Sequence, residues 1–473
     1  MKRMDEKIIA QIAAIVGEEH IKTSKAHLLA YSYDATANFQ RMPELVVSPA
    51  NTEQVSAILK ICNEHQVPII PRGSGTNLAA GTVPYDGGVV FLFNRMNEIV
   101  DFDKENLTLT VQPGIISEKV CQFVEAEGLF YPPDPSSMRI STIGGNVSEN
   151  SGGLRGLKYG VTKDYVKGLK VVLANGDVLE TGGKLAKDVA GYDLTSLFIG
   201  AEGTLGVITE ITLKLIPLPQ SKMTSLAYFN SLEDAARTVS TIIANKIIPA
   251  TLEFLDKKTI QAVEQFMKIG LPTDVEAMLL MEQDGHEAEV EQDVREMVRI
   301  AKENGATFTA LAEDTAEADR LKTARRVALS ALAKLKPTVI LEDATVPRSN
   351  LAEMVTKIND IAERYQVNIA TFGHAGDGNL HPTCLTDVRD AEEMHRVEAA
   401  FEEIFEAAIA LGGTITGEHG VGEMKSPYLE WKIGPVGIST MKLIKQSFDP
   451  NNILNPGKVF AKETKKRVVV QGG

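Results

Sequence analysis

The segment "ELVVSPANTEQVSAILKICNEHQVPIIPRGSGTNLAAG", residues Glu44 to Gly81, carries the clearest fold signal in the chain. Its apolar stretches predict two β-strands. Between them, Asn51 followed by Gln54 resembles the capping box that begins a helix. Four apolar residues between 55 and 62 recur at helical spacing and would pack that helix against a sheet. The second strand runs directly into the glycine-rich stretch Pro71 to Gly81.

Further strands and tight turns follow in the same part of the chain. "KVVLANGDVLE" predicts a hairpin, because Asn175-Gly176 is a preferred two-residue turn. "GTLGVITEITLKLIP" alternates between two faces, and one face consists of Val207, Thr209, Ile211 and Leu213. The prolines of "LIPLPQSK" predict a domain boundary near residue 218. Helices and strands alternate again up to "NIATFGH", so we expect an α+β fold.

The composition excludes several classes of protein. At 473 residues the chain suggests two or three domains. Its net charge of −14, without a long block of Lys and Arg, argues against nucleic acid as a partner. No apolar run reaches the length of a transmembrane segment, and Ile8, Ile12 and Ile15 fit an amphipathic helix better than a signal sequence.

The cysteines are equally informative. Cys62, Cys121 and Cys384 are scattered, with no C-x-x-C pair, which argues against a disulfide framework and against an iron–sulfur cluster held by this chain alone. We expect a cytoplasmic protein, or one peripheral to the inner face of the membrane.

Three glycine-rich segments lie in the first half of the chain: residues 71–81, 141–153 and 199–208. The Walker pattern is absent, and the Rossmann pattern fails because Leu78 stands where the third glycine belongs. Backbone N–H groups in glycine turns still bind anions without a helix. Each segment alone could be a structural turn, but the three together favour a large phosphate-bearing ligand.

The stretch "TFGHAGDGNLHP" places His374 and His381 seven residues apart. On a straight helix or a flat strand the two imidazoles could not reach one ion. They can meet only if the backbone turns sharply between them, and Gly376 and Gly378 make such a turn inexpensive.

Six motifs, in this order along the chain, resemble those of the FAD-linked D-2-hydroxyacid dehydrogenases: "PRGSGTNLAAG", "PPDPSS…STIGGNVSENSGG", "GAEGTLGVIT", "GHAGDGNLHP", "GEHGVGEMK" and "FDPNNILNPGK". That family, part of the vanillyl-alcohol oxidase superfamily, includes D-lactate dehydrogenases and the flavin subunit of bacterial glycolate oxidase. The resemblance implies a two-subdomain FAD-binding domain in residues 1–218. It further implies a substrate (cap) domain with an antiparallel sheet and a metal site in 219–425, and a C-terminal segment, 426–473, that returns to the FAD domain.

The resemblance also implies which residues bind FAD. The pyrophosphate would lie against Arg72, Gly73, Ser74, Gly75 and Thr76, with Asn77 beside it. The ribityl and flavin region would be lined by Pro135, Ser136, Ser141, Gly144, Gly145, Ser148 and Asn150. Glu202, Gly203, Gly206 and Ile208 would hold the adenine side, and Asn455 would touch the isoalloxazine. Some relatives attach flavin through a histidine near the position of Thr76, so we expect non-covalent FAD here.

A metal ion is implied as well. His374, His381 and Glu418 would hold a divalent cation (Zn, Mn or Fe) with positions open for substrate. A closed structural zinc site would need a fourth protein ligand, and the motifs offer no cysteine for it. Adjacent side chains of an extended chain diverge, so Glu418 can face the ion while His419 faces the substrate as the base. The reverse assignment of Glu418 and His419 stays open.

The implied reaction is oxidation of a small D-2-hydroxy acid, D-lactate first, to the 2-oxo acid. His419 would remove the hydroxyl proton while hydride passes to flavin N5. Arg325 would clamp the substrate carboxylate with its planar fork, unless it belongs to an ordinary basic helix face. Lys322 stands where the family often has tryptophan, so the match around Arg325 is loose.

The electrons must leave for an external acceptor, because the chain has neither iron–sulfur ligands nor a nicotinamide fingerprint. We expect an electron-transferring flavoprotein, a quinone, a cytochrome or an iron–sulfur subunit. The alternatives are the flavin subunit of a glycolate oxidase, an alditol-type alcohol oxidase, and a flavin-binding electron-transfer subunit that does not itself oxidise substrate.

Overall fold

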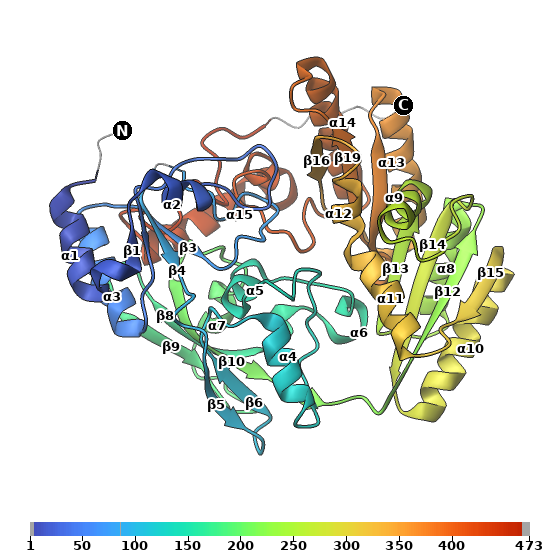
Figure 1. Ribbon diagram of the computed structural model, residues 1–473, viewed down its shortest axis with the longest axis horizontal. Coiled ribbons are helices and arrows are strands. Elements are labelled where there is room, and N and C mark those ends of the chain that lie inside the picture. Colours follow the sequence, from blue (N-terminus) through green and yellow to red (C-terminus); the bar gives the residue numbers. More distant parts are fainter. Residues whose placement is uncertain (1–3, 86, 466–473) are drawn as a thin grey trace. The chain divides into compact units, whose positions relative to one another are not determined.

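The computed structural model describes residues 4–85 and 87–465, and the chain forms two compact units (Figure 1). Unit 1 consists of residues 1–151, 161–218 and 418–473. Unit 2 consists of residues 152–160 and 219–417. The sequence led us to place residues 418–425 in the substrate domain and 152–160 in the FAD domain, so the structure differs at both points.

Hydrogen bonds explain these differences. The N–H groups of Val421 and Gly422 donate to the Glu202 carboxylate, at 2.7 and 2.6 Å, which ties the 418–425 segment to unit 1. The segment 152–160 is held in unit 2 by Lys158, whose Nζ lies 2.7 Å from Asp284 Oδ1.

One sheet of unit 1 contains the segment quoted first. Its strand order is β1 (Ile21–Lys22), β2 (Leu45–Val47), β4 (Val89–Leu92), β3 (Ile69–Arg72), and β4 is parallel to both of its neighbours, β2 and β3. Helix α3 (Thr52–Glu64) connects β2 to β3. The side chain of Asn51 caps α3 by accepting from Gln54 N, as the sequence predicts. The buried face of α3 joins helix α1 (Glu6–Val16) in one apolar cluster.

The second sheet of unit 1 is antiparallel. Its order is β5 (Ile99–Asp103), β6 (Thr108–Val111), β10 (Val207–Lys214), β8 (Val166–Val172), β9 (Val178–Gly182). The predicted hairpin is present as β8 and β9, with Gly176 at φ +85° in its turn. The predicted alternation of β10 is also confirmed, because Val207, Thr209, Ile211 and Leu213 are all fully buried.

The remaining elements of unit 1 are short, apart from its last helix. They are α2 (Lys25–Ala30), α4 (Ser117–Glu125), α5 (Ile143–Glu149), α7 (Leu194–Phe198), the pair β7 (Leu129–Phe130) and β11 (Ile216–Pro217), and α15 (Leu429–Phe448). Helix α15 bends at Gly434 and packs Phe448 against Phe198 of α7. "STIGGNVSENSGG", which the sequence suggested to be a loop, instead forms α5, capped by Thr142.

Unit 2 is built on one large sheet with the order β15-β12-β14-β13-β18-β19-β16, to which β17 pairs through β19. The strands are β12 (Ser221–Phe229), β13 (Thr251–Asp256), β14 (Ala277–Gly285), β15 (Ala306–Leu311), β16 (Thr338–Leu341), β17 (Ala344–Thr345), β18 (Ile369–His374) and β19 (Asn379–Thr386). Every pair among them is antiparallel. The expected antiparallel sheet is thus confirmed.

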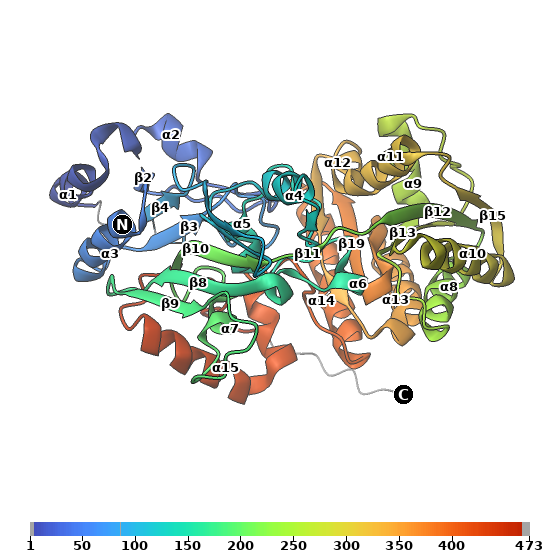
Figure 2. The same cartoon turned by 90° about the horizontal axis from the view of Figure 1, so that it is seen from below.

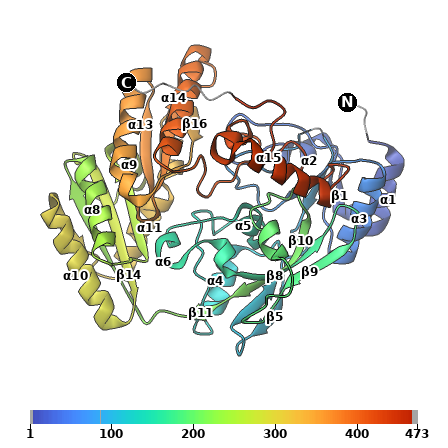
Figure 3. The ribbon, with the colours of Figure 1, turned by 180° about the vertical axis from the view of Figure 1, so that it is seen from behind.

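Helices cover both faces of this sheet. One face packs against α8 (Leu232–Ala244), α10 (Glu287–Glu303), α13 (Leu351–Tyr365) and α14 (Ala391–Ala410), and α13 and α14 lie side by side (Figure 3). Helices α9 (Lys257–Met267), α11 (Thr315–Arg326) and α12 (Ala328–Leu332) lie over the opposite face (Figure 2). The short helix α6 (Gly156–Tyr159) completes unit 2. Among the described residues, no helix is long and apolar enough to span a bilayer.

Candidate active site

The glycine-rich segments of unit 1 converge on one pocket. Its lining consists of Pro71, Arg72, Gly73, Gly81, Thr82, Phe93, Pro113, Thr142, Gly144, Gly145, Ser148, Glu149, Glu202, Gly203, Gly206 and Ile208. All three segments singled out in the sequence contribute. Of the residues expected at FAD, the pocket brings together Arg72, Gly73, Gly144, Gly145, Ser148, Glu202, Gly203, Gly206 and Ile208.

Two glycines show why this pocket needs residues without side chains. A Cβ on Gly73 would lie 2.4 Å from Thr142 Oγ1, and one on Gly144 would lie 2.5 Å from Pro113 Cβ. The first glycine segment therefore approaches the start of α5 more closely than any side chain permits. Bare backbone of this kind suits a large ligand, because glycine lets the main chain approach it closely.

The other residues expected at FAD do not line this pocket, and several have structural contacts. Asn77 Oδ1 accepts from the N–H groups of Ala79 and Gly81, at 2.8 and 2.6 Å. Ser74 Oγ donates to the Ile140 carbonyl. These bonds shape the first glycine segment. Gly75, Thr76, Pro135, Ser136, Ser141 and Asn150 also lie outside the lining.

Asn455 joins the C-terminal segment to the pocket walls. Its Nδ2 donates to the carbonyl oxygens of Gly81 and Glu202, at 2.9 and 2.8 Å. The residue is 2% exposed and its φ is +42°, a left-handed conformation that asparagine tolerates. Asn455 thus binds two glycine-rich segments to each other.

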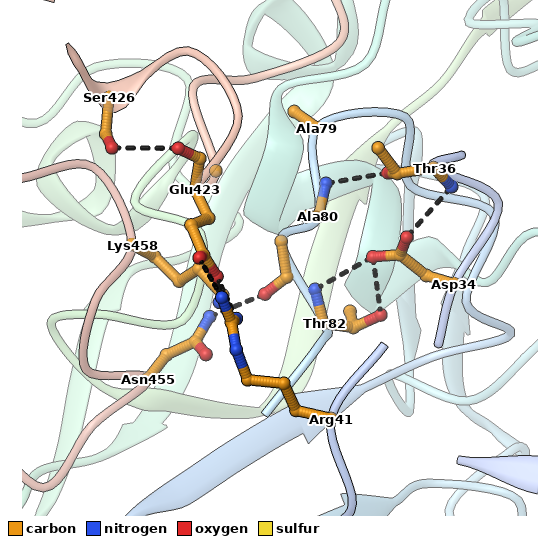
Figure 4. A network of polar contacts seen from close by, with 12 residues as sticks. Asp34, Thr36, Arg41, Ala79, Ala80, Thr82, Glu423, Ser426, Asn455 and Lys458 are labelled. Carbon is orange, nitrogen blue, oxygen red and sulfur yellow. Dashed lines mark hydrogen bonds and ion pairs between the residues drawn. The ribbon is translucent and has the colours of Figure 1, made fainter. Parts of the chain in front are cut away.

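A network of polar contacts lies beside Asn455 in unit 1 (Figure 4). Both terminal nitrogens of Arg41 donate to the Glu423 carboxylate, and Lys458 Nζ lies 3.2 Å from Glu423 Oε2. Burial raises the pKa of Glu423, but these two cations outweigh it and the net shift is downward. Asp34 accepts from the Thr36 and Thr82 N–H groups, which secures the end of the first glycine segment.

In unit 2 the two expected histidines meet. His374 ends β18, His381 lies in β19, and their ring nitrogens come within 4.8 Å of each other. The chain turns between them at Gly378, whose φ is +82° and whose Cβ would lie 2.1 Å from the Val346 carbonyl. Gly376 has another role, since a Cβ there would lie 2.6 Å from the Leu157 side chain.

Glu253, which the sequence reasoning missed, organises this part of the site. It lies in β13, is fully buried, and its Oε1 is 2.7 Å from His374 Nδ1. Its Oε2 is 2.5 Å from Arg325 Nε. Burial raises the pKa of Glu253, but His374 and Arg325 outweigh it and lower the pKa below its ordinary value. An ionised Glu253 selects the His374 tautomer with hydrogen on Nδ1 and fixes the orientation of the ring.

Arg325 is 2% exposed, stacks 4.8 Å from the Phe372 ring centre, and is no ordinary basic surface residue. Within the described residues, its Nη2 is buried and has no hydrogen-bond partner. Lys322, one turn earlier on α11, forms a buried ion pair with Glu282 at 2.8 Å. Lys322 and Arg325 therefore both reach carboxylates of the sheet.

Asp343 is a further carboxylate near the histidines. Its Oδ1 lies 3.8 Å from His381 Nδ1, and its Oδ2 accepts from Thr416 Oγ1 and Gly417 N at 2.8 and 2.6 Å. Glu418 follows Gly417 directly, which makes it the first residue of the chain's return to unit 1. Within unit 1, Glu418 Oε1 lies 3.8 Å from His419 Nε2.

Comparison with known proteins agrees with these observations. Residues 43–182 match the family described as "FAD binding domain", and residues 218–459 match "FAD linked oxidases, C-terminal domain". The chain is 62% identical to the glycolate oxidase subunit GlcD of Bacillus subtilis (strain 168) over 461 residues, which is 98% of each chain. It is 38% identical to the D-lactate dehydrogenase of Anaerostipes hadrus, over 91% of this chain and 93% of that one.

Solved structures support the fold. The substrate-bound p-cresol methylhydroxylase superposes with a TM-score of 0.80 at 19% identity, covering 96% of this chain and 97% of that one. The 4-ethylphenol oxidase from Gulosibacter chungangensis superposes with a TM-score of 0.78. At these identities the likeness concerns the fold alone, which is of the vanillyl-alcohol oxidase type.

Proposed function

Because this chain belongs to the FAD-linked oxidases, we propose that it is the FAD-carrying subunit of an enzyme that oxidises a small 2-hydroxy acid to the 2-oxo acid. The observation that carries the proposal is the 62% identity to a glycolate oxidase subunit over 98% of the chain. The sequence motifs alone favoured D-lactate. The lower identity to a D-lactate dehydrogenase, 38%, leads us to place glycolate first and D-lactate second.

In this proposal the lining of the unit 1 pocket would hold FAD non-covalently, and the cofactor would supply the hydride acceptor for oxidation of the substrate. The bare backbone at Gly73 and Gly144 supports the placement, because a side chain there would clash with the pocket wall. Asn455 would keep two walls of the pocket together around the cofactor.

A divalent cation is the second proposed group, with His374, His381 and Glu418 as ligands. When bound, it would lower the pKa of the substrate hydroxyl. The donor set fits, because two imidazoles and one carboxylate suit Zn, Mn or Fe. Glu253 supports the role of His374, since its contact with Nδ1 fixes the tautomer and the orientation of the imidazole ring. The N–H of Gly417 donates to Asp343, and this bond fixes the backbone directly before Glu418.

His419 would take the hydroxyl proton, and Arg325 would bind the substrate carboxylate. The buried Nη2 of Arg325, which lacks a partner among the described residues, supports this role. The ion pair between Glu253 Oε2 and Arg325 Nε holds the guanidinium beside the carboxylate. The reduced enzyme would pass its electrons to an external acceptor, such as an electron-transferring flavoprotein, a quinone or an iron–sulfur subunit.

The test is anaerobic. The purified FAD-loaded protein is mixed with glycolate, D-lactate, L-lactate or D-2-hydroxyglutarate, and loss of the flavin absorbance is followed before and after chelator treatment. We expect bleaching by glycolate, more slowly by D-lactate, and none after chelation. Bleaching that survives complete metal removal would contradict the roles of His374, His381 and Glu418. No bleaching by any acid would favour a flavin subunit that only transfers electrons.

The same assay tests Arg325. Arg325→Lys keeps the charge beside Glu253 but loses the two-pronged fork, so KM should rise about 10- to 100-fold while FAD content is unchanged. Arg320→Lys, at an exposed position on the same helix, is the matched control. Equal KM values for the two variants would argue against a carboxylate clamp.

A further inference from the structure

Two glutamates of unit 1 face the same pocket. Glu149 is the last residue of α5, and Glu202 lies in the third glycine-rich segment; both belong to the pocket lining. A Cβ built on Gly420 would lie 2.2 Å from Glu149 Oε2 and 3.2 Å from Glu202 Oε1. The two carboxyl groups therefore converge on one point, and Glu149 Oε2 is buried there.

Their hydrogen bonds distinguish the two groups. Glu202 accepts from two backbone donors, Val421 N on Oε1 and Gly422 N on Oε2. Burial is the largest influence on the pKa of Glu202 and the net shift is upward, although these two bonds and the charges of Lys458 and Lys425 oppose it. Backbone N–H donors and nearby cations favour the ionised form of a carboxylate. Of the two carboxyl groups, Glu202 is thus the one that its donors and neighbouring cations favour in the charged form.

Glu149 lies in the opposite environment. Burial is the largest cause that holds its pKa well above the ordinary range, followed by repulsion from Glu202 and Asp34. Asn77 opposes this by a hydrogen bond. The position at the end of α5 adds the helix carbonyls, which also disfavour a negative charge. Two carboxylates in one desolvated site do not both ionise.

We infer that Glu149 is held as a neutral carboxylic acid in the cofactor pocket and offers its O–H as a hydrogen-bond donor to bound FAD, while Glu202 carries the negative charge. The inference rests on the proposed function only in that FAD occupies this pocket. FAD brings an anionic diphosphate, so an ionised Glu149 would weaken its binding through both the lost donor and the added charge.

The experiment measures FAD affinity of the apoprotein across a pH series. Affinity should be constant while Glu149 is protonated and should then fall by up to tenfold per pH unit above the pKa of Glu149. Glu149→Gln keeps a neutral hydrogen-bond donor at every pH, so the FAD affinity of this variant should not fall as the pH rises. Glu125→Gln, at an exposed position on α4, should behave as wild type.

Glu202→Gln gives an independent arm. Removing the charge of Glu202 lowers the pKa of Glu149, so the fall in affinity should begin at a lower pH than in wild type. Infrared spectra supply a readout that needs no FAD. The carbonyl stretch of a protonated carboxylic acid should be present in the wild-type apoprotein and absent from Glu149→Gln.

Equal pH profiles for wild type and Glu149→Gln, or no acid band assignable to Glu149, would overturn the inference. A wild-type protein that binds no FAD at any pH would instead contradict the proposed function. In that case the infrared band would still report the protonation state of Glu149.

Discussion

At the scale of single residues, unit 2 places charges where solvent does not reach. Glu253 is the clearest case, because it bonds both His374 and Arg325 from a fully buried strand position. In the sequence, "ATLEFLD" is an ordinary apolar strand with one glutamate, and its partner histidine lies 121 residues later. No local pattern indicates such a partner, so sequence reasoning could propose His374 and Arg325 but not the carboxylate that joins them.

The pair Lys322–Glu282 leads to a stability prediction. The two side chains are 9% and 5% exposed, and Glu282 also accepts from Thr224 Oγ1. Lys322→Met leaves Glu282 buried without its cation, so we expect the free energy of unfolding to fall by about 3–5 kcal/mol. Denaturant unfolding near neutral pH measures this. Lys257→Met, which breaks an exposed pair with Glu276, is the control and should cost less than about 1 kcal/mol.

The pH dependence of this loss has a definite sign. Burial raises the pKa of Glu282, but Lys322 outweighs it and the net pKa lies below its ordinary value of 4.5. A lowered carboxyl pKa stabilises the fold above the unfolded value and loses that effect as the pH falls through the folded value. The gap between wild type and Lys322→Met should therefore narrow in acid. A gap that widens below pH 4.5 would contradict this account.

At the scale of elements, sequence reasoning worked where the signal was local. The capped helix after Asn51 and the hairpin at Asn175-Gly176 depend on neighbouring residues, and both are present. The segment 141–153 was read as a glycine loop, yet Thr142 caps a helix there. Its glycines allow close packing against Pro113 rather than a turn, which only the tertiary structure reveals.

The turn between β18 and β19 gives a prediction at this scale. Gly378→Ala combines a left-handed backbone with a Cβ that would lie 2.1 Å from the Val346 carbonyl. We expect a loss of about 2–4 kcal/mol in unfolding free energy and weaker metal binding, because His381 is displaced. Gly270→Ala is the matched control: its φ of +86° is similar, but nothing lies within 4 Å, so about 1 kcal/mol is expected. Similar losses in both variants would show that the contact with Val346 does not matter.

At the scale of the whole molecule, the single tryptophan reports on one unit. Trp431 lies in the first turn of α15 in unit 1, where its Nε1 donates to the Lys465 carbonyl at 2.8 Å. If FAD binds unit 1, saturating it at a hundredfold excess over Kd should stabilise that unit by about 2.7 kcal/mol. The Trp431 fluorescence transition should then move to higher temperature on FAD addition. If FAD is bound but the midpoint temperature of the Trp431 transition does not change, the cofactor does not stabilise unit 1, which would contradict the prediction.

The division of the chain was only partly accessible from sequence. The prolines after Leu215 indicated the boundary near residue 218, and the structure divides there. The composition of residues 152–160 does not indicate that they belong to unit 2. Their placement depends on the ion pair between Lys158 and Asp284, which lies far along the chain.

That placement limits how the two units can be exchanged between relatives. The backbone passes from one unit to the other after residues 151, 160, 218 and 417, so neither unit is one continuous stretch of gene. A chimaera that transplants only residues 219–417 would keep the host's nine-residue segment 152–160. Asp284 would then face side chains from a different protein in place of Lys158 and Tyr159. Recombination that preserves unit 2 has to transfer residues 152–160 together with residues 219–417. The sequences of these two segments should therefore change together among relatives.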